Sequence, residues 1–296
     1  MSSSSAIAPE PAGRGGDGPA PLTAASAAAP APVFVRWTWQ RIVLVAALAY
    51  AAYAAARWTG GTDEVAAHAN ALGLVDLERT LGLGFEGSVQ TALDVPALVF
   101  VLNHVYLAAQ FVVTPAALVW VTRRSRTAGA RLWETLVVGW ILATPVAALL
   151  PVAPPRLAGT GIADTITLSG SHTLTSPIAQ LFYNPLAAVP SMHAAFAFAV
   201  AAALASTART PVGRVLGAAW APLIAVTVVA TGNHYVLDVV AGLAVTLVAW
   251  LIVWGAPRLV ARAGGAIRAA RAPSLPAVPA PARASARAGF CSSRQS

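Results

Sequence analysis

The sequence predicts an all-α fold, a polytopic membrane helix bundle with six transmembrane helices. Three observations lead to this class. Of the 296 residues, 57% are hydrophobic and only 10% are charged, whereas soluble domains have about 25% charged residues. Six apolar runs of roughly 17 to 25 residues are each long enough to cross a hydrocarbon core about 30 Å thick as a helix. The basic residues are all arginines, and they gather beside alternate connections between these runs.

The two ends of the chain differ from its middle in composition. Residues 1–35 are rich in Ala, Pro, Ser and Gly and have few large apolar side chains, so they cannot bury enough surface to offset the entropy of ordering. Residues 265–296 form a basic tail of similar composition. We therefore expect a disordered tail at each end and a membrane domain over 36–264.

The six spans are expected at 40–57, 96–121, 132–151, 191–207, 215–231 and 235–254. Between the first two, residues 62–95 place apolar side chains at helical spacing with polar ones between them. This pattern is typical of helices that lie in the membrane interface. The segment is expected to be an interfacial helical region, either a structural cap over the bundle or a gate for a substrate.

The arginines predict the orientation, because cytoplasmic loops hold the excess of positive charge. Most of them precede the first span, fill the second-to-third and fourth-to-fifth connections, or follow the sixth span. All of these segments lie on one side of the predicted membrane. We therefore expect a multi-pass protein of the cell membrane with both termini in the cytoplasm. Its net charge of +8 reflects this placement, so no nucleic-acid partner is expected.

The stretch PSMH at 190–193 opens the fourth span on the extracytoplasmic side. Proline suits the first turn of a helix, and a helix N-terminus directs free N–H groups and the positive end of its dipole toward an anion. Ser191 and His193 are therefore candidates for phosphate chemistry. A capping serine and an interfacial histidine are the ordinary structural alternative.

A second polar stretch, GNHYVLD at 232–238, opens the sixth span on the same side. His234 and Asp238 are four residues apart, so on a helix the carboxylate can hold one ring nitrogen as N–H and leave the other as a nucleophile or base. An aspartate within the apolar zone costs roughly 2.5–3.5 kcal/mol on insertion scales. A functional role is therefore expected for Asp238.

The stretch PPR at 154–156 follows the third span, and Arg156 is one of the few arginines on the extracytoplasmic side. A guanidinium can bind two phosphate oxygens at once and offset their charge. The three stretches together supply a fixed cation, a helix N-terminus and two histidines. In-line phosphoryl transfer without a metal needs such a set.

These three stretches resemble the three signatures of the type 2 phosphatidic acid phosphatase superfamily. More narrowly, they resemble its branch that contains fungal inositol phosphorylceramide synthases and many actinobacterial membrane proteins, over residues 95–250. The resemblance implies that His234 forms a phosphohistidine, that Asp238 orients it and that His193 protonates the leaving group. It also implies phosphate binding by Arg156, Ser191 and Asn233.

Two positions depart from the common superfamily pattern. The first signature commonly has a lysine seven residues before its arginine, where this chain has Leu149. The third commonly has an arginine six residues before its histidine, where this chain has Val228. Two phosphate-binding cations are therefore missing, which leaves room for a transferase or a different substrate.

Three polar residues in the outer part of the second span, Asn103, His104 and Tyr106, are candidates for lining the same cavity. Hydrogen bonding between helices is the alternative. The sequence has no Cys/His ligand spacing and no glycine loop for phosphate, so neither a metal nor another cofactor is expected.

The expected function is that of a lipid-phosphate phosphatase or phosphotransferase at the extracytoplasmic face, with a membrane lipid or polyprenyl phosphate as substrate. Transfer of a phosphoinositol-type headgroup to a lipid or glycan acceptor is an alternative. A transporter is the alternative from a different class, because buried ionisable residues also mark transport pathways. Those residues gather here at one face rather than through the membrane depth, which favours an enzyme.

Overall fold

The computed structural model describes residues 38–59, 63–170 and 184–271. The predicted N-terminal tail and residues 272–296 of the C-terminal tail lie outside these ranges. Every element named within them is a helix, which confirms the all-α class. The last helix, α11 (Val236–Arg271), is helical through residues 265–271, which the sequence assigns to the tail.

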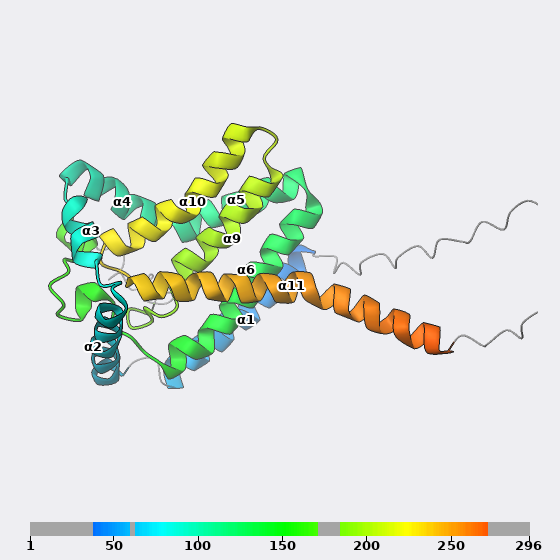
Figure 1. Cartoon of the computed structure of the whole chain (residues 1–296), viewed down its shortest axis with the longest axis horizontal. Coiled ribbons are helices and arrows are strands. Elements are labelled where there is room, and N and C mark those ends of the chain that lie inside the picture. The colour runs from blue at the N-terminus through cyan, green and yellow to red at the C-terminus, as the bar shows by residue number, and fades with distance from the viewer. Residues whose placement is uncertain (1–37, 60–62, 171–183, 272–296) are drawn as a thin grey trace, which may run out of the picture.

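Apolar helices occupy the positions of the predicted spans (Figure 1). Among the described residues, four helices are long and apolar enough to cross a membrane: Pro96–Arg124, Arg126–Leu149, Pro211–Ala230 and Val236–Gly255. Two more are shorter, namely Gln40–Ala55 within α1 (Trp39–Thr59) and α9 (Met192–Thr207). The helices indicate a multi-pass membrane protein, while the number of six crossings stays a prediction.

The second apolar helix is interrupted by a π-helical turn. It comprises α4 (Pro96–Ala108), the turn η1 (Ala109–Val113) and α5 (Thr114–Arg124). Pro115 has no N–H for the α-helical hydrogen-bond ladder, and just before it the N–H and the hydroxyl of Thr114 both donate to Ala109 O. Such widened turns occur frequently at functional sites.

Helix α9 lies at the centre of the bundle and packs against α5, α6 (Arg126–Leu149), α10 (Pro211–Ala230) and α11. Most of its buried residues are alanines, and small side chains let membrane helices approach closely. A Cβ on Gly217 of α10 would lie 2.8 Å from Ala205 N of α9. The central helix is therefore held tightly on several sides.

Two helices between α1 and α4 cover the end of the bundle where α11 begins (Figure 1). Helix α2 (Glu64–Leu81) starts at Asp63, which accepts a hydrogen bond from Ala66 N; α3 (Glu86–Ala92) follows it. Ala67 and Ala71 of α2 pack in an apolar cluster with residues of the loops and with Tyr235. The opposite side of α2 exposes apolar residues: Val65, Leu72, Leu77 and Leu81. Helix α2 therefore packs on the bundle along one face, while its role as a structural cap or as a substrate gate stays a prediction.

Candidate active site

The loops that carry PPR, PSMH and GNHYVLD meet at one end of the bundle, where backbone hydrogen bonds join them. With the donor first, these bonds are Val152 N to Leu186 O (2.8 Å), Ala188 N to Val152 O (3.1 Å), Arg156 N to Gly232 O (3.0 Å) and Ser191 N to Asp238 O (3.1 Å). Backbone hydrogen bonds therefore hold the three motifs next to one another.

Two glycines permit this close approach. Gly232 has a φ of 70°, a conformation that residues with a Cβ rarely adopt, and a Cβ there would lie 2.6 Å from Ala163 O. A Cβ on Gly242 of α11 would lie 2.5 Å from Ser191 O at the start of α9. A side chain at Gly232 would push the GNHYVLD turn away from the loop that follows PPR, and one at Gly242 would push α11 away from the start of α9.

His234 is buried in the turn between α10 and α11. Its Nδ1 lies 3.0 Å from Ala188 O and 3.3 Å from Asp238 Oδ2. Because both partners are acceptors, we assign the ring proton to Nδ1, which leaves the lone pair on Nε2. Asp238 is fully buried and its Oδ2 also accepts from Tyr235 N (3.0 Å). The carboxylate is therefore fixed, and it orients an imidazole that can act as a nucleophile or a base.

His193, in the first turn of α9, faces the same space. Its ring centroid lies 6.1 Å from that of His234. On its other side it stacks on Tyr106 at 4.2 Å, with 18° between the ring planes. The separation lets both imidazoles reach one bound phosphorus from different sides.

Arg156 lies in the 3-10 turn η2 (Pro155–Leu157) and its side chain is 6% exposed. Its Nε donates to Asn233 Oδ1 and its Nη1 pairs with Asp164 Oδ2, both at 3.0 Å. Asn233 Nδ2 in turn donates to Thr231 Oγ1 (2.9 Å). The guanidinium is thus oriented toward the GNHYVLD turn, next to an aspartate that offsets its charge.

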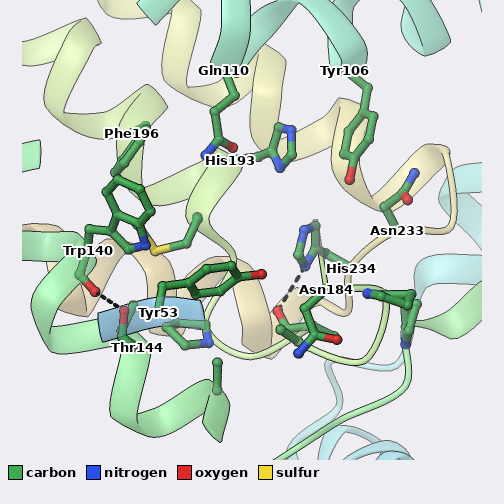
Figure 2. Close-up of a pocket in the computed structure, with 18 residues that line it drawn as sticks. Tyr53, Tyr106, Gln110, Trp140, Thr144, Asn184, His193, Phe196, Asn233 and His234 are labelled. Atoms are coloured by element: carbon green, nitrogen blue, oxygen red, sulfur yellow. Dashed lines mark hydrogen bonds between the residues drawn. The ribbon is translucent and has the colours of Figure 1, made fainter. Parts of the chain in front are cut away.

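The two histidines line an open cavity of about 140 Å³. Figure 2 shows Tyr106, His193, Asn233 and His234 on one side of it. On the other side lie three aromatic residues from three helices: Tyr53 of α1, Trp140 of α6 and Phe196 of α9. The rings of Tyr53 and Trp140 are 6.3 Å apart. The cavity therefore has a polar half with the histidines and an aromatic half.

The other predicted site residues are placed differently. Ser191 is fully buried, and its hydroxyl accepts from Ala194 N (3.3 Å) as the N-cap of α9. Neither Ser191 nor Arg156 is among the described residues that line the cavity. Asn103 is buried and donates to Thr165 O, whereas His104 is exposed and contacts Phe100 O. Of the three candidates in the second span, Tyr106 lines the cavity, while Asn103 and His104 do not.

Val228 and Leu149, at the two positions where superfamily members commonly carry further cations, do not line the cavity. Val228 is fully buried in an apolar cluster, and its carbonyl accepts from the N–H groups of Asn233 and His234, both at 3.1 Å. Leu149 is 85% exposed. Within the described ranges, no group of three or more His, Cys, Asp or Glu side chains is placed to hold a metal ion.

Several cavity residues were not identified from the sequence. Gln110 lies in the π-helical turn and lines the cavity; a polar residue four positions before a Thr-Pro pair in an apolar span was its signal. Tyr53 and Trp140 carry no comparable signal, because aromatic residues are common in membrane helices. Asp164, which pairs with Arg156, is not among the site residues predicted from the sequence.

Comparison with protein families matches residues 72–252 to the PAP2 superfamily. The match covers more than half of the chain and contains all three motifs, while α1 and its Tyr53 lie outside it. Searches of curated proteins and of solved structures found no match.

Proposed function

Because the chain belongs to the PAP2 superfamily, whose members are metal-independent phosphatases and phosphotransferases with a histidine nucleophile, we propose that it transfers the phosphoryl group of a membrane lipid phosphate through His234. The observation that carries this proposal is the pair of imidazoles 6.1 Å apart across one cavity, with Asp238 behind His234 alone. That asymmetry gives the two rings different tasks.

In the first step the Nε2 lone pair of His234 attacks phosphorus, and the bond from phosphorus to the lipid oxygen breaks. His193 donates its proton to that leaving oxygen. The negative charge of a bound phosphate favours the protonated form of this ring. Asp238 stabilises the positive charge that develops on His234, since its carboxylate accepts from Nδ1.

In the second step an oxygen nucleophile attacks the phosphohistidine. Water or an alcohol gives its proton to His193, forms a bond to phosphorus, and releases Nε2 of His234. Both rings return to their starting protonation. The same residues therefore serve hydrolysis and transfer, and the identity of the incoming oxygen decides between them.

Phosphate oxygens are expected near Asn233 and the N-terminus of α9. Asn233 lines the cavity and contacts Arg156, and α9 directs N–H groups of its first turn to the same space. Ser191 contributes by capping this helix. Arg156 is proposed to contact phosphate after adjusting its pairing with Asp164, which keeps the guanidinium in the correct orientation without substrate.

We assign the apolar part of the substrate to the aromatic half of the cavity. Phe196 is one helical turn beyond His193 on α9, so a leaving group protonated by His193 can extend along Phe196, Trp140 and Tyr53. Most arginines lie next to the opposite ends of the apolar helices, so by the positive-inside rule the site is proposed to lie at the extracytoplasmic face.

Transfer to an alcohol acceptor is the second candidate, and the residues at two positions favour it. Val228 and Leu149 stand where phosphatases of the superfamily commonly carry cations, and neither directs a charge to the site. The resemblance to the inositol phosphorylceramide synthase branch also favours transfer. Product analysis with and without an added lipid alcohol distinguishes transfer from hydrolysis.

The test is phosphate release by purified protein in detergent from phosphatidic acid and from a polyprenyl diphosphate. His234→Ala is expected to reduce release to the protein-free rate. His104→Ala is the matched control, since this histidine is exposed and outside the cavity, and it should keep wild-type activity. Chelators should leave the wild-type rate unchanged. Retained activity of His234→Ala, or a requirement for added metal, would contradict the proposal.

A further inference from the structure

Two buried carboxyl groups lie at the start of α11, outside the cavity lining. Glu78 of α2 and Glu86 of α3 are 1% and 8% exposed. Glutamates are almost never fully buried unless they are paired, yet none of the salt bridges between described residues includes either one. The proposed reaction uses neither residue, so their burial needs another explanation.

Both carboxyl groups bind the first turn of α11. Glu86 Oε1 accepts from Val236 N at 3.0 Å, and Glu78 Oε1 accepts from Leu237 N at 2.7 Å. These N–H groups have no partner within their own helix. Asp238 takes the preceding N–H, that of Tyr235. Three acidic side chains therefore fix the turn that directly follows His234.

Glu86 and Glu78 accept from the N–H groups of adjacent residues, Val236 and Leu237, so the two buried carboxyl groups lie close together, and one of them must carry a proton to donate to the other, because ionised carboxylates only accept. Burial, followed by the hydrogen bond to Glu86, raises the pKa of Glu78 to about 8. The titratable groups that face Glu78 are Glu86 from α3 and, at the start of α11, Asp238 and Tyr235. All of them are acidic or neutral, so none stabilises a second negative charge.

We propose that Glu78 and Glu86 share one proton and act as a positioning pair, which holds the first turn of α11 and thereby places His234 and Asp238 for the transfer reaction. This inference rests on the proposed function. With its proton the pair carries one negative charge, which suits a helix N-terminus. Without it, two buried charges stand beside Asp238, and repulsion loosens the turn.

The direction in which folding stability changes with pH follows from the raised pKa of Glu78. The pKa of Glu78 lies above its ordinary value of 4.5 in the folded protein. Between 4.5 and about 8 the folded protein therefore binds more protons than the unfolded chain, so stability falls as the pH rises through this window and levels off above it. The turnover rate should also fall at alkaline pH, because loss of the same proton loosens the turn that places His234 and Asp238.

The test uses Glu78→Gln and Glu78→Ala in the full chain. Glutamine keeps an acceptor for Leu237 N, can donate to Glu86 and is neutral at every pH. It should retain wild-type kcat at pH 7, lose most of the fall in kcat as the pH rises through about 8, and lose most of the fall in melting temperature between pH 4.5 and about 8. Alanine removes the contact, and we expect kcat to fall by about 10- to 100-fold, the order of loss that misplacement by about 1 Å produces. KM should change little, because Glu78 does not line the cavity.

Asp76→Asn is the matched control, since Asp76 is an exposed carboxylate on the same helix. It should change neither kcat nor the pH dependence of the melting temperature. Wild-type kcat in Glu78→Ala would overturn the positioning role. An unchanged pH dependence of melting in Glu78→Gln would overturn the shared proton. If the wild-type protein releases no phosphate from any lipid, the proposed function fails, while melting against pH still decides whether the carboxyl pair exists.

Discussion

Replacing Gly242 with alanine tests whether the contact between α9 and α11 sets the distance between the two histidines. The added Cβ would lie 2.5 Å from Ser191 O, 3.1 Å from Ala195 N and 3.3 Å from Ala194 Cβ. An ordinary contact begins at 3.4 Å, so the start of α9 must move away from α11 by about 0.9 Å, the difference between 3.4 and 2.5 Å. His193 lies two residues after Ser191 and moves with it.

Stability and activity should respond differently to this change. Alanine is better than glycine within a helix by about 0.8–1.0 kcal/mol, while overpacking costs about 1–3 kcal/mol. The net loss of folding stability is therefore at most about 2 kcal/mol. A displacement of about 1 Å in a catalytic group can lower the rate by about 100-fold, so kcat should fall by this order in a folded protein.

Phosphate release and thermal unfolding in detergent measure the two effects. Gly139→Ala is the control, because a Cβ on this glycine of α6 meets Val245 Cγ1 at 3.7 Å and Ala249 Cβ at 4.0 Å, which are ordinary contacts with α11. It should keep full activity. Full activity in Gly242→Ala would refute the argument that this contact sets the geometry of the site.

Three further substitutions test other parts of the site. His193→Ala should slow phosphate release strongly from a lipid alkoxide and much less from an activated aryl phosphate, which leaves without a proton; equal losses with both substrates would remove its role as the acid. Arg156→Lys keeps the charge but cannot bond Asn233 and Asp164 with a planar fork, so kcat/KM should fall by about 10- to 100-fold, as for one lost charged hydrogen bond; an unchanged value would show that orientation of the cation is unimportant. Trp140→Ala removes part of the aromatic half and should raise KM for a long-chain lipid phosphate by about 10-fold or more, yet spare a short-chain alkyl phosphate; a parallel rise for both would place the lipid chain elsewhere.

The helical architecture was predictable because its signals are local. Each apolar run shows in its own composition, and the chemistry of PPR, PSMH and GNHYVLD is visible in short stretches. The positions of Asn103, His104 and Tyr106 could have been separated in the same way. Residues three apart on a helix share a face and adjacent ones do not, so Asn103 and Tyr106 are both buried while His104 is exposed.

The parts that the sequence did not predict depend on contacts between distant residues. Glu78 accepts a hydrogen bond from Leu237 N, and Asp164 offsets the charge of Arg156. Both contacts form because α2 and the loops fold against the start of α11. Tyr53 enters the cavity only because α1 packs on α6. None of these contacts has a spacing or composition that marks it in the chain.

Trapping the intermediate tests the central claim most directly. Purified protein is mixed with a lipid phosphate labelled in the phosphoryl group, quenched within the first turnover and digested for peptide mapping. We expect an acid-labile, base-stable adduct on the peptide that contains His234, present in Ser191→Ala and absent in His234→Ala. Label on Ser191 or on His193 in its place would contradict the assignment of His234 as the nucleophile.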